Sequence, residues 1–171
     1  MEIIDNFIPK DIFTPIQEKF LEPKFPWHWC DSKSFRGEKD GDDILCDELY
    51  NHQFVHWFFY HTNRVSDNWD IVEPILNFLD IKALIRIKAN LNVRTHEIVT
   101  YGFHTDVEYG DVTSKTAIFY INTNNGKTIF ENGSEVDSIE NRIVLFDSNL
   151  VHTGTSCTDQ KRRIVLNFNY F

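Results

Sequence analysis

The second half of the chain consists of short segments in which apolar and polar residues alternate, and this pattern constrains the fold most. Residues 84–93 alternate with period two, as expected for a β-strand whose successive side chains point to opposite faces. Asn125-Gly126 and Asn132-Gly133 are tight-turn signals, and the first lies between two strand-like runs, as in a β-hairpin. The other strand-like runs are residues 98–103, 116–122, 127–130, 142–146 and 163–171. Short strands separated by turns predict a β jelly roll over residues 83–171.

The first half has a different character. Residues 11–20 and 70–79 place apolar side chains at helical spacing, whereas the aromatic and imidazole-rich run 52–61 fits either a buried strand or a buried helix. Residues 31–43 are polar and rich in Gly and Asp, which predicts a surface loop that could serve as a lid. We therefore expect one domain, 1–171, mainly β with α, in which a helical and aromatic layer (1–82) backs a jelly-roll core (83–171).

Composition argues against several classes of protein. The net charge of −9 argues against nucleic-acid binding, which depends on clustered Lys and Arg. No stretch approaches the ~20 apolar residues of a membrane helix, and the N-terminus lacks the pattern of a signal peptide. The cysteines are odd in number and widely separated, which indicates neither a disulfide framework nor a zinc site: Cys30, Cys46 and Cys157. A reducing, cytoplasmic location is expected.

One set of residues has the composition of a metal site. His104 and Asp106 are two apart, so on an extended strand both side chains would point to the same face. His152 follows 46 residues after Asp106 and can complete a set of two imidazoles and one carboxylate. Such a set occupies one face of a metal ion and leaves other positions open, as in non-haem Fe(II) oxygenases. Arg163, eleven positions after His152, could bind the carboxylate of a co-substrate.

From about residue 84 to its end, the chain resembles the 2-oxoglutarate- and Fe(II)-dependent dioxygenases, and most of all their prolyl-4-hydroxylase-like branch. The matching pieces occur in the family's order, and they are Gly-Phe-His-Thr-Asp (102–106), Ala-Ile-Phe-Tyr-Ile-Asn (117–122), Gly-Lys-Thr-Ile-Phe (126–130), Leu-Phe-Asp-Ser-Asn-Leu-Val-His (145–152) and Arg-Ile-Val-Leu-Asn-Phe-Asn (163–169). The resemblance implies a double-stranded β-helix fold.

The resemblance further implies that His104, Asp106 and His152 bind Fe(II), and that a basic residue pairs with the far carboxylate of 2-oxoglutarate. Arg162 and Arg163 are the two candidates for that role. Adjacent side chains on a strand point to opposite faces, so only one of them can enter the barrel. The family's tail aligns with residues 163–169, which favours Arg163. A guanidinium also suits a buried carboxylate anchor better than an ammonium does.

Three more positions match co-substrate residues of the family less closely. Tyr120 lies where related hydroxylases place a tyrosine hydroxyl on the same carboxylate, and Thr128 lies where they place a threonine after a Gly-Gly pair. This chain has Asn125-Gly126 there, so one glycine of the motif is missing. Asn92 falls near a position that the family usually gives to tyrosine. A structural role remains an alternative for all three.

The function implied by the resemblance is hydroxylation of an unactivated C–H bond, with dioxygen consumed and 2-oxoglutarate decarboxylated to succinate; ascorbate is a further cofactor that such an enzyme could use. A prolyl or other residue in a peptide or protein is the favoured substrate, and a free amino acid or small metabolite is the alternative. A nucleic-acid substrate fits poorly, because the second arginine of that branch is replaced by Asn169. A second class of function is a catalytically silent, metal-binding jelly-roll module.

Other candidate sites are weaker. His52 and His56 have the spacing of a zinc-protease motif, but Gln53 stands where its glutamate should follow, so ordinary core or rim histidines are favoured. The acidic stretch 40–43 lacks the spacing of a calcium loop. Cys157 is close enough to His152 in the sequence to approach the site, but a small rim residue is the favoured interpretation.

Overall fold

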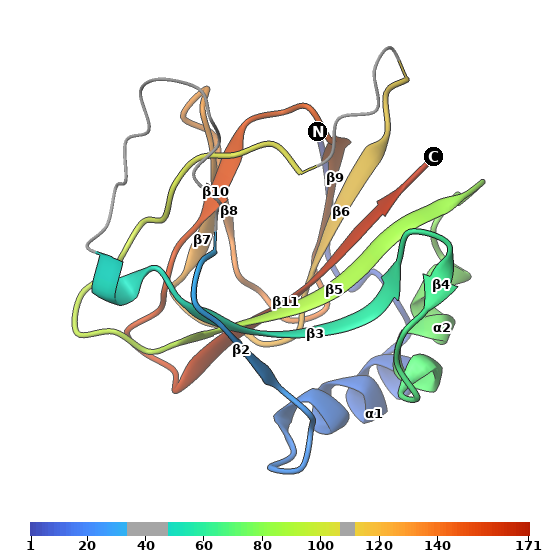
Figure 1. Cartoon of the computed structure of the whole chain (residues 1–171), viewed down its shortest axis with the longest axis horizontal. Helices are drawn as coiled ribbons and strands as arrows, with labels where there is room; N and C mark the ends of the chain where they lie inside the picture. The colour runs from blue at the N-terminus through green and yellow to red at the C-terminus, as the bar shows by residue number, and fades with distance from the viewer. Residues whose placement is uncertain (34–47, 107–111) are drawn as a thin grey trace.

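The computed structural model describes residues 1–33, 48–106 and 112–171 of the chain. Two β-sheets face each other, and the two α-helices of the described part lie outside the larger sheet (Figure 1). The elements follow in the order β1 (Glu2–Ile4), α1 (Lys10–Leu21), β2 (His28–Cys30), the 3₁₀ helix η1 (Glu48–Tyr50), β3 (Gln53–Tyr60), β4 (Asn63–Arg64), α2 (Trp69–Leu76), β5 (Leu84–Val93), β6 (Lys115–Tyr120), β7 (Lys127–Phe130), β8 (Glu135–Asp137), β9 (Ile143–Asp147), β10 (His152–Gly154) and β11 (Arg162–Tyr170).

The larger sheet has the strand order β1-β9-β6-β11-β5-β3-β2, with β4 paired to β3, and the smaller has the order β10-β7-β8. All of these strand pairs are antiparallel. The predicted mainly β jelly roll is confirmed. Residues of β3, β5 and β11 in the larger sheet and of β7 and β10 in the smaller sheet line one cavity between the two sheets.

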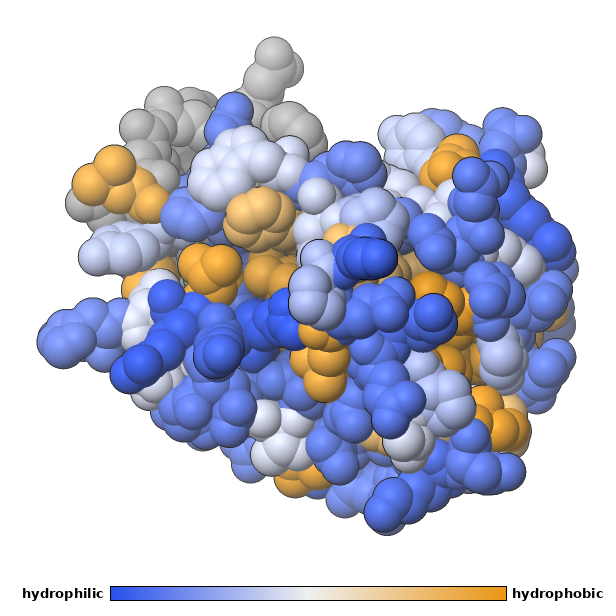
Figure 2. Space-filling view, turned by 90° about the horizontal axis from the view of Figure 1, so that it is seen from below, coloured by the Kyte–Doolittle hydropathy of each residue, from blue (hydrophilic) through white to orange (hydrophobic). Residues whose placement is uncertain are grey.

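Apolar side chains join α1 and α2 to the outer face of the larger sheet. Phe13, Ile16 and Phe20 are the buried positions of α1 and recur at helical spacing. Phe13 contacts Phe119 of β6 edge to face, with 5.9 Å between the ring centroids. The outer side of this layer is mostly hydrophilic, with apolar residues scattered over it (Figure 2). In the described residues, neither helix has the length and apolar character needed to cross a membrane.

The alternation of β5 separates the apolar layer from the cavity. Its odd-numbered residues Ile85, Ile87, Ala89 and Leu91 are buried, and all but the first belong to the apolar cluster beneath the helices. From position 86 onward the even-numbered residues face the opposite side of the sheet and line the cavity, and they are Arg86, Lys88, Asn90 and Asn92. β11 pairs with β5 and contributes cavity-lining residues at Arg163, Val165 and Asn167.

The first half of the chain contributes more β-structure than the sequence indicated. Residues 53–60 form strand β3, which settles the ambiguity of the aromatic run in favour of a strand. Strands β1, β2 and β4 also belong to the larger sheet, so residues 1–82 form part of the jelly roll as well as the layer behind it. The loop predicted at 31–43 lies outside the described residues from position 34 onward, as does the acidic stretch 40–43.

Two local predictions were wrong. Residues 98–103 do not form a strand: within the segment only Thr100 makes an isolated bridge, to Thr155, and Val99 N–H donates to the Ser156 hydroxyl instead of to a carbonyl. Asn125-Gly126 does not close a hairpin, because β6 belongs to the larger sheet and β7 to the smaller one. The other turn, at Asn132-Gly133, does join two paired strands, β7 and β8, and Gly133 has the positive φ of 83° that glycine tolerates.

Candidate metal centre and cavity

His104, Asp106 and His152 converge at one side of the space between the sheets. Their potential ligand atoms all lie within 4.8 Å of one another. Reciprocal backbone hydrogen bonds hold the two histidines together, from His104 N–H to His152 O (2.9 Å) and from His152 N–H to His104 O (3.0 Å). Asp106 N–H donates to Ser148 O (3.2 Å), so the segment ahead of β10 also positions the carboxylate.

Both imidazole rings present the nitrogen that a metal requires. His104 Nδ1 lies 3.2 Å from Gly102 O, and His152 Nδ1 lies 2.9 Å from Leu150 O. A carbonyl oxygen only accepts hydrogen bonds, so each Nδ1 carries the proton and each Nε2 keeps its lone pair. Each Nε2 lies 3.9 Å from one oxygen of Asp106. Desolvation, followed by the proximity of His152, lowers the pKa of His104, which favours the neutral form that binds metals.

The Asp106 carboxylate is buried in a network of donors. Arg86 donates to Oδ1 at 2.8 Å, while Thr116 Oγ1 (3.0 Å) and Asn169 Nδ2 (3.2 Å) donate to Oδ2. Burial alone would raise the pKa of Asp106, but the guanidinium of Arg86 and the two histidines outweigh it and hold this pKa well below its usual range. The carboxylate is therefore ionised and fixed in orientation, as a metal ligand needs to be.

A second polar cluster surrounds the guanidinium of Arg163, which is 3% exposed. Nε donates to Ser138 Oγ at 2.8 Å and Nη2 to Thr128 Oγ1 at 3.2 Å, while the Tyr120 hydroxyl donates to Thr128 Oγ1 at 2.8 Å. Burial lowers the pKa of Arg163 and raises that of Tyr120, and arginine keeps its charge under such conditions. No described carboxylate pairs with this buried cation, so the cluster is suited to an anionic ligand.

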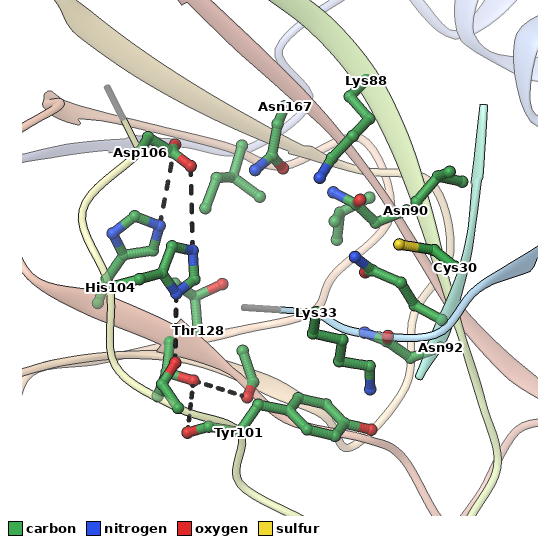
Figure 3. A pocket seen from close by; sticks show the side chains of 18 of the residues that line it. Cys30, Lys33, Lys88, Asn90, Asn92, Tyr101, His104, Asp106, Thr128 and Asn167 are labelled. Atoms are coloured by element: carbon green, nitrogen blue, oxygen red, sulfur yellow. Dashed lines mark hydrogen bonds and ion pairs between the residues drawn. The ribbon is translucent and has the colours of Figure 1, made fainter. Parts of the chain in front are cut away.

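The two clusters border the same cavity of about 580 Å³, a volume typical of small-molecule sites. His104 and Asp106 lie on one side, Thr128 and Tyr101 lie at one end, and Lys88 and Asn167 lie at the other end (Figure 3). Among the predicted co-substrate residues, Arg163, Thr128 and Asn92 line the cavity directly. Tyr120 is fully buried and reaches the cluster through Thr128.

The remaining sequence candidates lie elsewhere. Arg162 points to the other face of β11 and donates to Leu21 O at the end of α1 (2.6 Å). His56 is buried with both ring nitrogens hydrogen-bonded, to Pro26 O and to Ser66 Oγ, as expected for a core histidine. Cys157 is buried, contacts Gln160 O and does not line the cavity.

Sequence reasoning missed several residues of the site. Arg86 and Asn169, which hold Asp106, are cross-strand partners on β5 and β11. The period-two pattern of residues 84–93 could have identified Arg86, because it shares a face with Asn92. Ser138 follows β8 in a connecting segment, where no pattern pointed to it.

Gly126 lies too close to neighbouring atoms to carry a side chain. A Cβ atom there would lie 2.5 Å from Ser156 O and 2.6 Å from Cδ of Arg163. We expect Gly126→Ala to displace the Arg163 side chain and to lower the free energy of unfolding by about 1–3 kcal/mol, the cost of overpacking. Thermal unfolding measures this effect. Gly154→Ala is the matched control, because its Cβ would lie 3.4 Å from Arg163 Nη1; an equal loss in both variants would contradict the prediction.

Comparisons with known proteins agree with this architecture. No protein-family model and no curated protein matches the sequence. Among solved structures, a prolyl-4-hydroxylase from Pseudomonas putida is 14% identical, with 99% of this chain and 92% of that chain covered and a TM-score of 0.58. A prolyl hydroxylase from Trichoplax adhaerens, solved with a peptide fragment of the hypoxia inducible factor oxygen degradation domain, is also 14% identical, with coverage of 99% and 82% and a TM-score of 0.60.

A third structure has the same fold and a different activity. The non-haem α-ketoglutarate-dependent epimerase SnoN from nogalamycin biosynthesis is 9% identical, with coverage of 98% and 76% and a TM-score of 0.57. The chain therefore has the fold of the prolyl hydroxylases and of other 2-oxoglutarate-dependent enzymes. At these identities the fold is common to different reactions, so the reaction has to be inferred from the site.

Proposed function

We propose that this protein is an Fe(II)- and 2-oxoglutarate-dependent oxygenase, with His104, Asp106 and His152 as the metal ligands. The observation that carries the proposal is the pairing, in one cavity, of this ligand set with the buried cation of Arg163. Two neutral imidazoles and one carboxylate form the ligand set of non-haem Fe(II) oxygenases, and they leave coordination positions open. The residues fit the metal because each Nε2 carries a lone pair and Asp106 is held as an anion.

Each part of the site has a defined task in this proposal. Ferrous iron, when bound, supplies the redox chemistry that activates dioxygen. Arg163 pairs with the far carboxylate of 2-oxoglutarate, and Thr128 fixes the guanidinium on one side while Ser138 fixes it on the other. Asn92 is the cross-strand partner of Arg163 and faces the same end of the cavity. The apolar residues around Tyr120, including Ile118 and Val165, exclude water from this end.

The balanced reaction consumes 2-oxoglutarate, dioxygen and a substrate C–H bond, and releases succinate, carbon dioxide and the hydroxylated product. The experiment supplies the purified full chain with Fe(II) and 2-oxoglutarate under air and measures succinate, with Fe(II) omitted as the control. We expect succinate to form only with the metal. Binding of Fe(II) and 2-oxoglutarate without any succinate would instead favour the catalytically silent module.

The substrate, the cytoplasmic location and the use of ascorbate stay predictions. A peptide substrate is supported by the fold shared with prolyl hydroxylases, one of which was solved with a peptide fragment. A small-molecule substrate is supported by the polar side chains that line the cavity far from Arg163, namely Lys88, Asn90 and Asn167.

A further inference from the structure

The end of the cavity away from Arg163 is lined by polar side chains that the proposed co-substrate does not use. On the paired strands β5 and β11, Arg163 lies opposite Asn92, Val165 opposite Asn90, and Asn167 opposite Lys88. All of these side chains line the cavity. Lys88, Asn90 and Asn167 are on the opposite side of the opening from Thr128, which marks the Arg163 end (Figure 3).

Two asparagine oxygens at this end have no hydrogen-bond partner among the described residues. Asn90 and Asn167 are each 8% exposed, and the Oδ1 atom of each is buried and unpaired. An unsatisfied buried acceptor costs about 1–3 kcal/mol, and native proteins satisfy nearly all such groups. An amide oxygen accepts hydrogen bonds, so a ligand that satisfies these two atoms has to present N–H or O–H groups.

Lys88 adds a positive charge beside these acceptors. Its ammonium lies 5.2 Å from the centroid of the Trp57 ring and makes no ion pair within the part of the chain that the structure describes. Burial, together with the neighbouring Arg86, lowers the pKa of Lys88 to about 8, although Asp106 and Cys30 oppose the shift. The side chain is still mostly protonated at neutral pH. An ammonium held in a partly desolvated cavity is stabilised by an anion.

2-Oxoglutarate bound to Arg163 is too short to supply that anion. The guanidinium of Arg163 is held on Thr128, and Lys88 lies at the other end of the cavity (Figure 3). Asn167, the cross-strand neighbour of Lys88, is four residues from Arg163 on β11, which separates their Cα atoms by about 13 Å. The two carboxyl carbons of 2-oxoglutarate are only about 5 Å apart, because four C–C bonds of about 1.5 Å join them. Arg86 is already paired with Asp106 and is not free to serve a further ligand. An acidic group on a second ligand would therefore be needed to pair with Lys88.

We propose that Lys88, Asn90 and Asn167 form the subsite for the molecule that is oxidised, and that this molecule is a small carboxylic acid bearing N–H groups, as a free α-amino acid does. Lys88 receives the carboxylate, and the two amide oxygens accept hydrogen bonds from the nitrogen. The inference rests on the proposed function for its assignment of the ligand as a substrate, whereas the binding it describes does not depend on turnover.

The test is a calorimetric titration of the full chain loaded with Zn(II) and 2-oxoglutarate, which cannot turn over. The probes are the free protein amino acids, each compared with its own carboxamide, and a short proline-containing peptide blocked at both ends. We expect at least one free amino acid to bind at least tenfold more tightly than its carboxamide. Lys88→Met should remove that preference, and Lys88→Arg should retain most of it. Asn167→Leu should weaken binding of the same amino acid about tenfold.

Controls separate this subsite from the co-substrate site. Lys115→Met, which changes an exposed lysine of β6 paired with Asp147, should leave the preference unchanged. Binding of 2-oxoglutarate should change less than twofold in Lys88→Met. The proposal is overturned if no free amino acid shows a Lys88-dependent preference over its carboxamide, or if the blocked peptide binds more tightly than every amino acid. It is also overturned if Lys88→Met weakens binding of 2-oxoglutarate instead of binding of the amino acid. Failure of the proposed function has a different signature, which is absence of metal-dependent succinate with the amino-acid preference intact.

Discussion

Replacing Asp106 by alanine should abolish succinate formation and weaken metal binding by more than the roughly 10–100-fold that partners outside the ligand set contribute. The change removes the only carboxylate of the ligand set, whose side chain is 3% exposed and ionised. It also leaves Arg86 without its anionic partner, so we expect the free energy of unfolding to fall by about 3 kcal/mol. Titration with Co(II), followed by its visible absorption, measures the affinity, and thermal unfolding measures the stability.

Asp147→Ala is the matched control for this prediction. Asp147 is half exposed on β9 and pairs with Lys115, and a surface ion pair of this kind contributes about 0–1 kcal/mol. The control should keep wild-type metal affinity and activity. Undiminished Co(II) binding by Asp106→Ala would show that the metal is held elsewhere.

Replacing Arg163 by methionine should raise the KM for 2-oxoglutarate by about 100-fold or more. Each hydrogen bond to a charged group contributes about 1.5–3 kcal/mol, and a guanidinium can pair with the far carboxylate through two of them. Arg163→Lys should recover only part of the affinity, because an ammonium cannot bind Ser138, Thr128 and the ligand in the planar geometry of a guanidinium. Succinate formation as a function of 2-oxoglutarate concentration measures the effect, and Co(II) affinity should change little.

Arg162 supplies the control on the same strand. Its guanidinium donates to Leu21 O on the helix side of the sheet, so Arg162→Met should lower stability and leave the KM for 2-oxoglutarate unchanged. If Arg162→Met and Arg163→Met raised KM equally, the assignment of the carboxylate anchor to Arg163 would be wrong.

Predictions based on periodicity succeeded where the pattern was long. The run 84–93 became strand β5 with its alternation intact, and the segment 127–130 became β7 with the same bounds. Prediction failed at residues 98–103, because a side-chain hydroxyl and an isolated bridge replace the regular ladder there. It failed again at Asn125-Gly126, because a turn signal does not determine to which sheet the next strand belongs.

The site was predictable only in part for a similar reason. Imidazole, carboxylate and guanidinium groups can be recognised from the sequence, so the candidate ligands and Arg163 can be named from residue type and spacing. Their supporting partners are separated from them by many residues: Arg86 is 20 positions from Asp106, and Ser138 is 25 positions from Arg163. No local pattern links residues at such separations.

The order of residues along the chain is enough to establish which chemical groups are available and on which face of a strand each one lies. A period of two assigns Arg86, Lys88, Asn90 and Asn92 to one side of β5, whatever stands opposite. What stands opposite depends on the three-dimensional fold. The pairing of β5 with β11 brings Lys88 beside Asn167 and Asn92 beside Arg163, and the bridge between His104 and His152 closes the ligand set. Alternation is a local consequence of backbone geometry, whereas strand pairing depends on contacts between distant parts of the chain.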